Sequence, residues 1–330
     1  NNQNNFFNNN NKCLVKNYYI KTAYNCCCGS EYKNSFVNEC ALNTCIREGA
    51  RCLDFEIYSY NGEPIVAAST ANNNTIKETF NYLKLYRVFE ILRDDAFNSS
   101  VTSCAYDPMF LHFRIMSETS SMYDKIAQYI EDVLDEYDNV ADVNTFNYKY
   151  TNQDNLLEEP ISSTDLQEKF IIMVNTLHST ILENSDLVNY THVRSGSNTM
   201  QLMRYDELIA SGENNALTID KSKRSLIMVL PSINNDIFNF DPYLAFGNGC
   251  QFIGMKFQNM DNYLKSYFNA FKDRGNFSFI IKPSNLRKDL IEEEVDLIEE
   301  EAESDLVTTT TTGFQRRRDN RQNRRDNLFN

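Results

Sequence analysis

Short apolar runs alternate with amphipathic stretches along most of the chain. Amphipathic patterns with helical spacing cover residues 76–97, 118–134 and 260–272. Strands alternating with helices are typical of a closed parallel barrel. The chain is therefore predicted to be an α/β protein. The apolar runs predict eight strands, at residues 18–23, 52–58, 64–68, 109–115, 170–174, 225–230, 251–255 and 277–281.

The segments around this pattern differ sharply in composition. Residues 1–11 contain eight asparagines and predict a flexible arm, because such a segment has little apolar surface to bury. Residues 137–168 are polar and are interpreted as a linker between residues 12–136 and 169–290, the two halves of the barrel. Residues 291–307 predict an acidic helix, and residues 308–330 a tail rich in threonine and arginine.

Charge and cysteine content narrow the classes of function. The net charge of −14 over 330 residues argues against nucleic acid as a partner of the barrel and against adhesion to anionic lipid. No apolar run reaches the length of a transmembrane helix, and the polar start predicts no signal peptide. The nine cysteines have no spacing typical of a zinc site, so we expect reduced thiols in a reducing compartment.

Two sets of motifs carry a family resemblance. The run from Gly249 to Asp261, continued at residues 280–283, is similar to the Y-box of phosphoinositide-specific phospholipases C. Residues 49–58, 63–66 and 107–111 are similar to the X-box of the same family. The resemblance covers about residues 14–135 and 165–290. It implies a TIM-like (β/α)8 barrel formed from an X-like and a Y-like half, with low-complexity tails.

The resemblance also implies a chemistry, and the chain departs from it at the catalytic positions. In the family, the inositol 2-hydroxyl attacks phosphorus, and two histidines handle protons and charge. Those positions hold Tyr24 and Ala68 here. A tyrosine with an ordinary pKa near 10 is a poor base at neutral pH, and alanine carries no proton to transfer. The positions of two family lysines that contact the substrate phosphate hold Met173 and Asn175.

The family's calcium site is only partly retained. Asn25, Asp54 and Glu56 match three ligand positions, and Arg114 stands at the fourth. A guanidinium between two carboxylates replaces the charge of the ion and repels it, so no metal or other cofactor is expected. Asp54 and Glu56 also have a plainer interpretation, as polar residues at the end of a barrel strand.

The histidines that remain are not expected to restore catalysis. His112 shares a strand face with Arg114 by the alternation of side chains, but it lies on the wrong strand for either family histidine. His178 and His192 are interpreted as surface residues or as hydrogen-bonded polar residues.

These substitutions favour a chain that is not an enzyme. The leading hypothesis is a non-catalytic barrel that acts as a structural or binding module, as a minor capsid or virion component of a large DNA virus. Its partners would then be virion proteins bound through the terminal arms, and its location the virion or the cytoplasm. Two alternatives stay open: a phosphoinositide-binding pseudoenzyme or signalling scaffold, and a metal-independent phosphodiesterase or lyase with altered chemistry.

Overall fold

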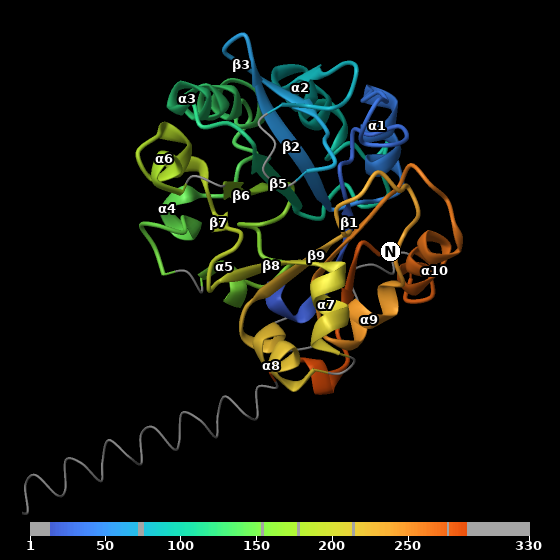
Figure 1. Ribbon diagram of the computed structural model, residues 1–330. Coiled ribbons are helices and arrows are strands. Elements are labelled where there is room, and N and C mark those ends of the chain that lie inside the picture. Colours follow the sequence, from blue (N-terminus) through green and yellow to red (C-terminus); the bar gives the residue numbers. More distant parts are fainter. Residues whose placement is uncertain are drawn as a thin grey trace, which may run out of the picture. The chain divides into compact units, whose positions relative to one another are not determined.

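Parallel strands surrounded by helices make up the body of the protein (Figure 1). The computed structural model describes residues 14–71, 76–152, 155–176, 179–212, 215–275 and 277–288. The predicted arm at residues 1–11, the acidic helix and the tail therefore lie outside the described residues, as does His178. Among the residues described, no helix has the length and apolar character needed to span a lipid bilayer.

Eight parallel strands form the barrel, in the spatial order β7-β6-β5-β2-β1-β10-β9-β8. The predicted TIM-like α/β class is therefore confirmed. Within the described residues no strand pairing joins β7 to β8, so the ring has a seam at this place. The barrel strands are β1 (Tyr18–Ala23), β2 (Cys52–Tyr60), β5 (Met109–Ile115), β6 (Phe170–Thr176), β7 (Val193–Arg194), β8 (Met200–Arg204), β9 (Leu226–Leu230) and β10 (Phe252–Met255).

Three further strands lie outside the ring. β3 (Glu63–Ala67) folds back antiparallel on β2 and pairs in turn with β4 (Leu83–Lys84), and β11 (Phe279–Ile281) runs antiparallel to β1. The hairpin between β2 and β3 turns at Asn61 and Gly62, which both have positive φ, as this type of turn requires. Two of the predicted barrel strands, at residues 64–68 and 277–281, were therefore wrong as barrel members. An apolar run does not show which neighbour it will pair with.

Helices cover the outside of the strands in Figure 1. The segment Ile130–Leu134 continues α3 as a π-helix, and single 3₁₀ turns occur at Val15–Asn17, Asp186–Tyr190 and Ser284–Leu286. The helices are α1 (Glu39–Arg47), α2 (Leu85–Asp95), α3 (Ser120–Tyr129), α4 (Val143–Phe146), α5 (Asn155–Glu158), α6 (Ser179–Glu183), α7 (Tyr205–Ser211), α8 (Ala216–Arg224), α9 (Pro242–Gly247) and α10 (Asn262–Lys272).

The predicted helix at residues 76–97 was wrong in its first part. The helix begins only at Leu85, because Asn81 is held in an extended segment. Its side chain accepts a hydrogen bond from the Val37 amide and donates one to the Val37 carbonyl. The spacing of apolar residues does not reveal hydrogen bonds between a side chain and a distant backbone segment, so this helix start could not be predicted from it.

The segment at residues 137–168 does more than link two halves. It contains α4 and α5, buries Phe146, Leu156 and Leu157, and bridges Leu14 through Pro160. The described chain up to residue 287 belongs to one compact unit, so the X-like and Y-like halves share one core.

The Gly-Cys-Gln motif has a structural role in this core. The buried Gln251 side chain donates to the carbonyls of Lys16 and Ser222 and accepts from the Ile227 amide, so it ties three segments together at the amino ends of the strands. Gly249 has a φ of +74°, and a Cβ there would lie 2.4 Å from the Ser222 hydroxyl oxygen. The Gly-Cys-Gln motif thus stabilises the end of the barrel where the strands begin. The opposite end, where the strands finish, is called the mouth of the barrel below.

Candidate functional site

Four ionisable side chains lie on one face of two neighbouring strands, inside the barrel. β2 and β5 are parallel, and their register sets Asp54 beside His112 and Glu56 beside Arg114. Because side chains alternate along a strand, these residues two apart point to the same side. All four are buried, with at most 5% of Arg114 exposed. In TIM barrels the carboxyl ends of the strands carry the active site, and the Glu56–Arg114 pair lies toward that end.

Arg114 lies at the centre of the cluster. Its Nε and Nη2 donate to the two oxygens of Asp54 at 2.9 and 2.8 Å, and its Nη1 donates to Glu56 Oε1 at 2.6 Å. Nη2 also donates to Asn25 Oδ1 at 2.7 Å. The bidentate bond to Asp54 is the strongest geometry available to a guanidinium and a carboxylate. The structure thus brings together all four residues of the predicted degenerate metal site.

Both carboxylates have further donors. Glu56 Oε2 accepts hydrogen bonds from the Tyr58 hydroxyl and the Ser69 amide, both at 2.9 Å. Asp54 Oδ2 accepts a bond from the Asn25 amide at 3.1 Å. Asn25 adopts a φ of 43°, which turns its amide and its side chain toward the same cluster. Buried charges are tolerated when every lone pair finds a partner of this kind.

The charges of the cluster hold each other ionised. Burial raises the pKa of Asp54, but the charge of Arg114 and the hydrogen bonds from His112 and Arg114 outweigh it, so the pKa lies well below its ordinary value. Burial lowers the pKa of Arg114, and the charges of Asp54 and Glu56 more than reverse that effect. An ionised carboxylate and a guanidinium therefore persist at neutral pH.

This arrangement does not fit calcium. The ion takes six to eight oxygen ligands, roughly 2.3–2.6 Å away. Here the Asn25, Asp54 and Glu56 oxygens that would face an ion already accept hydrogen bonds from Arg114. No cluster of three or more His, Cys, Asp or Glu side chains suited to a metal occurs in the described part of the chain.

The two family histidine positions hold residues that cannot replace a histidine. The Tyr24 ring lies under Arg114, with its centroid 4.9 Å from the guanidinium carbon, and burial raises the pKa of its hydroxyl further. Ala68 is fully buried, and its carbonyl accepts bonds from the amides of Glu78 and Thr79. Neither position can exchange a proton near pH 7.

The structure also shows a hydrogen-bonded series of residues that the sequence analysis did not predict. His112 Nδ1 lies 2.7 Å from Asp54 Oδ1, and His112 Nε2 lies 2.8 Å from the hydroxyl oxygen of Ser195, just after β7. The series Ser195–His112–Asp54 therefore links a hydroxyl, an imidazole and a carboxylate. It resembles the nucleophile, base and orienting acid of a catalytic triad. The predicted absence of any role for His112 considered only the two family positions, and no sequence motif marks Ser195.

The protonation of His112 follows from this hydrogen-bond network. Burial lowers the pKa of His112 below its ordinary value, although the Asp54 carboxylate acts in the opposite direction. A neutral imidazole with Nδ1–H donating to Asp54 leaves Nε2 free to accept the Ser195 proton. This is the tautomer that a general base needs.

The other predicted positions have structural surroundings. Met173 is buried next to His112 on β6, and the Asn175 side chain donates to the Ser195 carbonyl at 3.2 Å. His192 is buried, with Nδ1 accepting from the Ile172 amide and Nε2 facing the Ala141 carbonyl at 2.9 Å. Of the two interpretations given for His192 from the sequence, a surface residue or a hydrogen-bonded polar residue, the structure supports the second.

Comparison with known proteins identifies the fold. No family model and no curated protein sequence matches the chain. Among solved structures, PLC21 of S. officinalis superposes with a TM-score of 0.67 at 17% identity, and PLC21 of L. pealei with 0.65 at 17%. Both superpositions cover 84% of this chain and 38% of the neighbour, so the chain spans well under half of either protein.

A bacterial structure has the same fold. A calcium-dependent phosphoinositol-specific phospholipase C from Pseudomonas sp. superposes with a TM-score of 0.52 at 11% identity, over 81% of this chain and 95% of that one. The described chain therefore has the TIM-barrel fold of phospholipase C-like phosphodiesterases, and the resemblance seen in the sequence is confirmed at that level.

One prediction is corrected by these comparisons. The chain was expected not to be an enzyme, and this is contradicted because the structures that share its fold are phospholipases C. The substitutions at Tyr24 and Ala68 remove the family's proton transfers at those positions, but they say nothing about other groups in the mouth. None of the three structures is a capsid or virion protein, so the virion location and the virion partners stay predictions.

Proposed function

We propose that this barrel cleaves a phosphodiester without a metal ion, with the Ser195–His112–Asp54 series at its mouth as the reacting group. The observation that carries the proposal is the pair of short hydrogen bonds of His112, one to the Ser195 hydroxyl and one to Asp54. The fold supports the choice of substrate class, because structures that share it are phospholipases C, enzymes that cleave phosphodiesters.

The reaction proposed for these groups has two balanced steps. In the first, Ser195 Oγ forms a bond to phosphorus and the bond from phosphorus to the departing alcohol breaks. His112 Nε2 takes the serine proton and gives it to the departing oxygen. In the second step, water attacks the phosphoserine ester, His112 removes the water proton, and that proton returns to Ser195 as the ester bond breaks.

Arg114 supplies positive charge where the family uses an ion. Its four hydrogen bonds within the described residues use four of its five N–H groups, and we assign the remaining N–H, on Nη1, to a phosphate oxygen. Arg204, at the end of β8, donates from Nη1 to the Pro231 carbonyl and adds a second positive charge, which contributes to lowering the pKa of His112 after the larger effect of burial. Fixed cations facing a phosphoryl group stabilise the charge of the transition state.

The mouth is nearly closed. Only 3% of Ser195 and 5% of Arg114 is exposed. A phosphodiester therefore reaches these atoms when the loops at the carboxyl ends of the strands move aside, as lids do in many enzymes. We expect slow turnover limited by that opening.

The test is hydrolysis of bis(p-nitrophenyl) phosphate and of phosphatidylinositol vesicles by the full chain, with EDTA or with calcium. We expect turnover that EDTA leaves unchanged. Ser195→Ala should lower it at least about 10²-fold, because the reacting hydroxyl is removed. Mass spectrometry of the chain quenched during turnover should show a phosphate ester on the peptide that contains Ser195.

Ser197→Ala is the matched control. Ser197 lies in the same turn, and its hydroxyl accepts a bond from the Met200 amide, but it has no contact with His112 in the described residues. We expect wild-type turnover from this variant. The proposal is wrong if the wild type shows no turnover above a blank, if EDTA abolishes turnover, or if Ser195→Ala and Ser197→Ala behave alike.

A further inference from the structure

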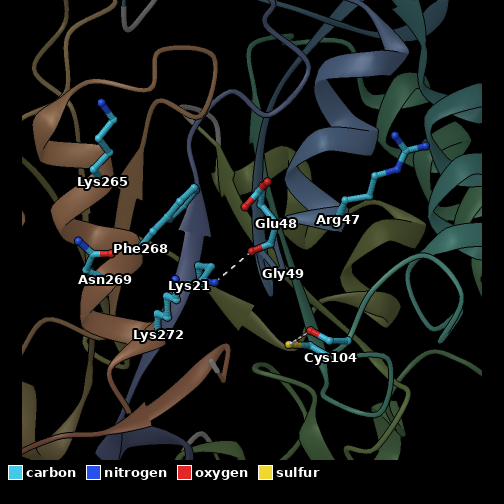
Figure 2. A pocket seen from close by; sticks show the side chains of 10 residues that line it. Lys21, Arg47, Glu48, Gly49, Cys104, Lys265, Phe268, Asn269 and Lys272 are labelled. Atoms are coloured by element: carbon cyan, nitrogen blue, oxygen red, sulfur yellow. Dashed lines mark hydrogen bonds between the residues drawn. The ribbon is translucent and has the colours of Figure 1, made fainter. Parts of the chain in front are cut away.

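A second feature lies on the flank of the barrel, away from the mouth. A cavity of about 440 Å³ opens between α1 and α10 (Figure 2). Lys21 of β1 lines it from the outer side of the sheet, since its side chain lies against Phe268 and Phe271 of α10. Gly49, which comes just before β2, lies close to Lys21 and also lines the cavity. The cavity is therefore separate from the Arg114 cluster inside the ring.

The lining is strongly cationic. Lys21, Arg47, Lys265 and Lys272 line the cavity, and Glu48 is the one carboxylate among the lining residues, which leaves a net charge of +3. Figure 2 shows Lys265 and Lys272 on the α10 side of Lys21, while Arg47 extends from α1 on the other side. The whole chain carries a net charge of −14, so the concentration of cations here runs against its composition.

Lys21 is a buried ammonium that forms no ion pair within the described residues. It is 6% exposed, and its Nζ donates to the Glu48 carbonyl at 3.0 Å. The rings of Phe268 and Phe271 lie 5.4 and 5.3 Å from Nζ and stabilise it only in part. Among the described residues no carboxylate forms an ion pair with it.

Burial accordingly lowers the pKa of Lys21, and the charge of Glu48 opposes this effect only in part. A buried cation with no counter-ion costs free energy, and a bound anion would recover it. Lys265 and Lys272 of α10 are exposed and hydrated, so they add positive charge at the rim of the cavity without this cost.

We propose that this cavity binds a small phosphate-bearing anion. A phosphate carries close to two negative charges and several acceptor oxygens, which match an ammonium at the base and two more on α10. A single carboxylate would leave most of the +3 charge uncompensated. The volume is within the roughly 300–1,000 Å³ typical of small-molecule pockets, so the ligand is larger than a bare ion, and Phe268 offers an apolar wall for the rest of it.

The test is isothermal titration of the full chain with inorganic pyrophosphate. We expect saturable binding that weakens as salt is added, because the rim cations are exposed. Lys265→Gln and Lys272→Gln should each weaken binding by about tenfold, the effect of losing one charge-assisted hydrogen bond. Both residues are exposed, so the fold should survive. Glu48→Gln should tighten binding by removing the repelling carboxylate.

Lys84→Gln is the control for a general loss of charge. Lys84 is exposed on β4 and does not line the cavity, so its loss should leave pyrophosphate binding unchanged. Absence of saturable binding overturns the proposal, and so does an equal effect of Lys84→Gln and Lys272→Gln. Ser195→Ala should bind pyrophosphate like the wild type, which separates this test from that of the mouth.

Vesicles distinguish two sources of the same chemistry. Co-sedimentation with phosphatidylcholine vesicles that contain phosphatidic acid, abolished by pyrophosphate and by Lys272→Gln, would identify a lipid headgroup. Pyrophosphate binding without co-sedimentation would identify a soluble phosphate compound. Either result supports the site and names its ligand more closely. Co-sedimentation that Lys272→Gln leaves unchanged, with no pyrophosphate binding, would place the anion elsewhere and overturn the proposal.

Discussion

Two buried cations of this protein have opposite surroundings. Arg114 lies inside the barrel, where Asp54 and Glu56 neutralise it and Asn25 accepts a further hydrogen bond. Lys21 lies on the outside of the same sheet and has a carbonyl and two aromatic rings as neighbours. Carboxylates of the chain neutralise Arg114, whereas the counter-charge for Lys21 would come from the bound anion proposed above.

The difference teaches how to distinguish a stabilising charge from a binding charge. A guanidinium with most of its N–H groups bonded inside the protein contributes to folding, and removing it leaves unpaired carboxylates. A buried ammonium without a counter-ion destabilises the folded protein, and binding of an anionic ligand would offset that loss. Matched substitutions at the two positions should therefore change stability by different amounts.

The largest effect is expected from Arg114→Met. It leaves Asp54 and Glu56 buried without their counter-charge, at a cost of roughly 3–5 kcal/mol in the free energy of unfolding. Urea denaturation at pH 7 measures this. Arg87→Met is the control, because Arg87 pairs with Glu39 and Glu90 on the surface and should matter little. Equal losses in the two variants would contradict the central role of Arg114.

Acid should destabilise the protein through the buried imidazole of His192, which forms no ion pair within the described residues. Burial lowers the pKa of His192 to about 4, against an ordinary value of about 6.5. The unfolded chain therefore takes up its proton first as pH falls. The contribution to stability is complete above about pH 6.5 and is lost progressively down to pH 4, by about 3 kcal/mol.

Urea denaturation across this pH range measures the loss. In the folded protein His192 Nδ1 accepts the Ile172 amide proton, so a second ring proton has no acceptor there. His192→Gln should lose less stability than the wild type between pH 7 and pH 4. A parallel decline of both proteins would assign the acid sensitivity to other groups.

Reversing the charge at position 114 should let a calcium ion take the place of the Arg114 guanidinium beside Asp54 and Glu56. Arg114→Glu places three carboxylates near the Asn25 amide, a set of oxygens that suits calcium. Calcium at about 100 times its dissociation constant should stabilise this variant by about 2–3 kcal/mol and leave the wild type unchanged. Magnesium should stabilise less, since it requires stricter geometry. Melting curves with each ion decide, and an equal response of the wild type would refute the assignment.

The smallest change in stability is expected from Lys21→Met. The substitution removes a buried charge and keeps apolar contact with the rings of α10, so the free energy of unfolding should change by less than about 1 kcal/mol. Pyrophosphate binding should be lost at the same time. A loss of stability as large as that of Arg114→Met would show that the Lys21 ammonium is compensated within the chain.

The fold class could be predicted because buried strands leave local apolar runs, and the Arg114 cluster could be predicted because its residues match motif positions of the phospholipase C family. Buried strands such as β6 and β9 appear as apolar runs in the sequence, and Asp54 and Glu56 stand two residues apart, so they share one strand face. Arg114 followed from the same alignment. The parallel register of β2 and β5, which the sequence does not give, places Glu56 beside Arg114 and brings the predicted residues into contact.

The rest was not predictable from local signals. β7 has two residues, too few for any periodicity, and β8 mixes Gln201 and Arg204 with its apolar residues. Ser195 reaches His112 across 83 positions of the chain, and the cavity at Lys21 gathers residues from three elements far apart in sequence. These arrangements depend on barrel closure and helix packing, which no single stretch of sequence encodes.

The seam between β7 and β8 has a consequence for how the barrel opens. Within the described residues β7 pairs only with β6, so one of its backbone edges lacks the ladder that protects amide protons elsewhere in the ring. Segments with few backbone bonds exchange hydrogen with solvent through local unfolding, well below the free energy of global unfolding. Deuterium should therefore enter β7 early and β5 late. The same fluctuation would uncover the Ser195 hydroxyl while the Arg114 cluster stays intact.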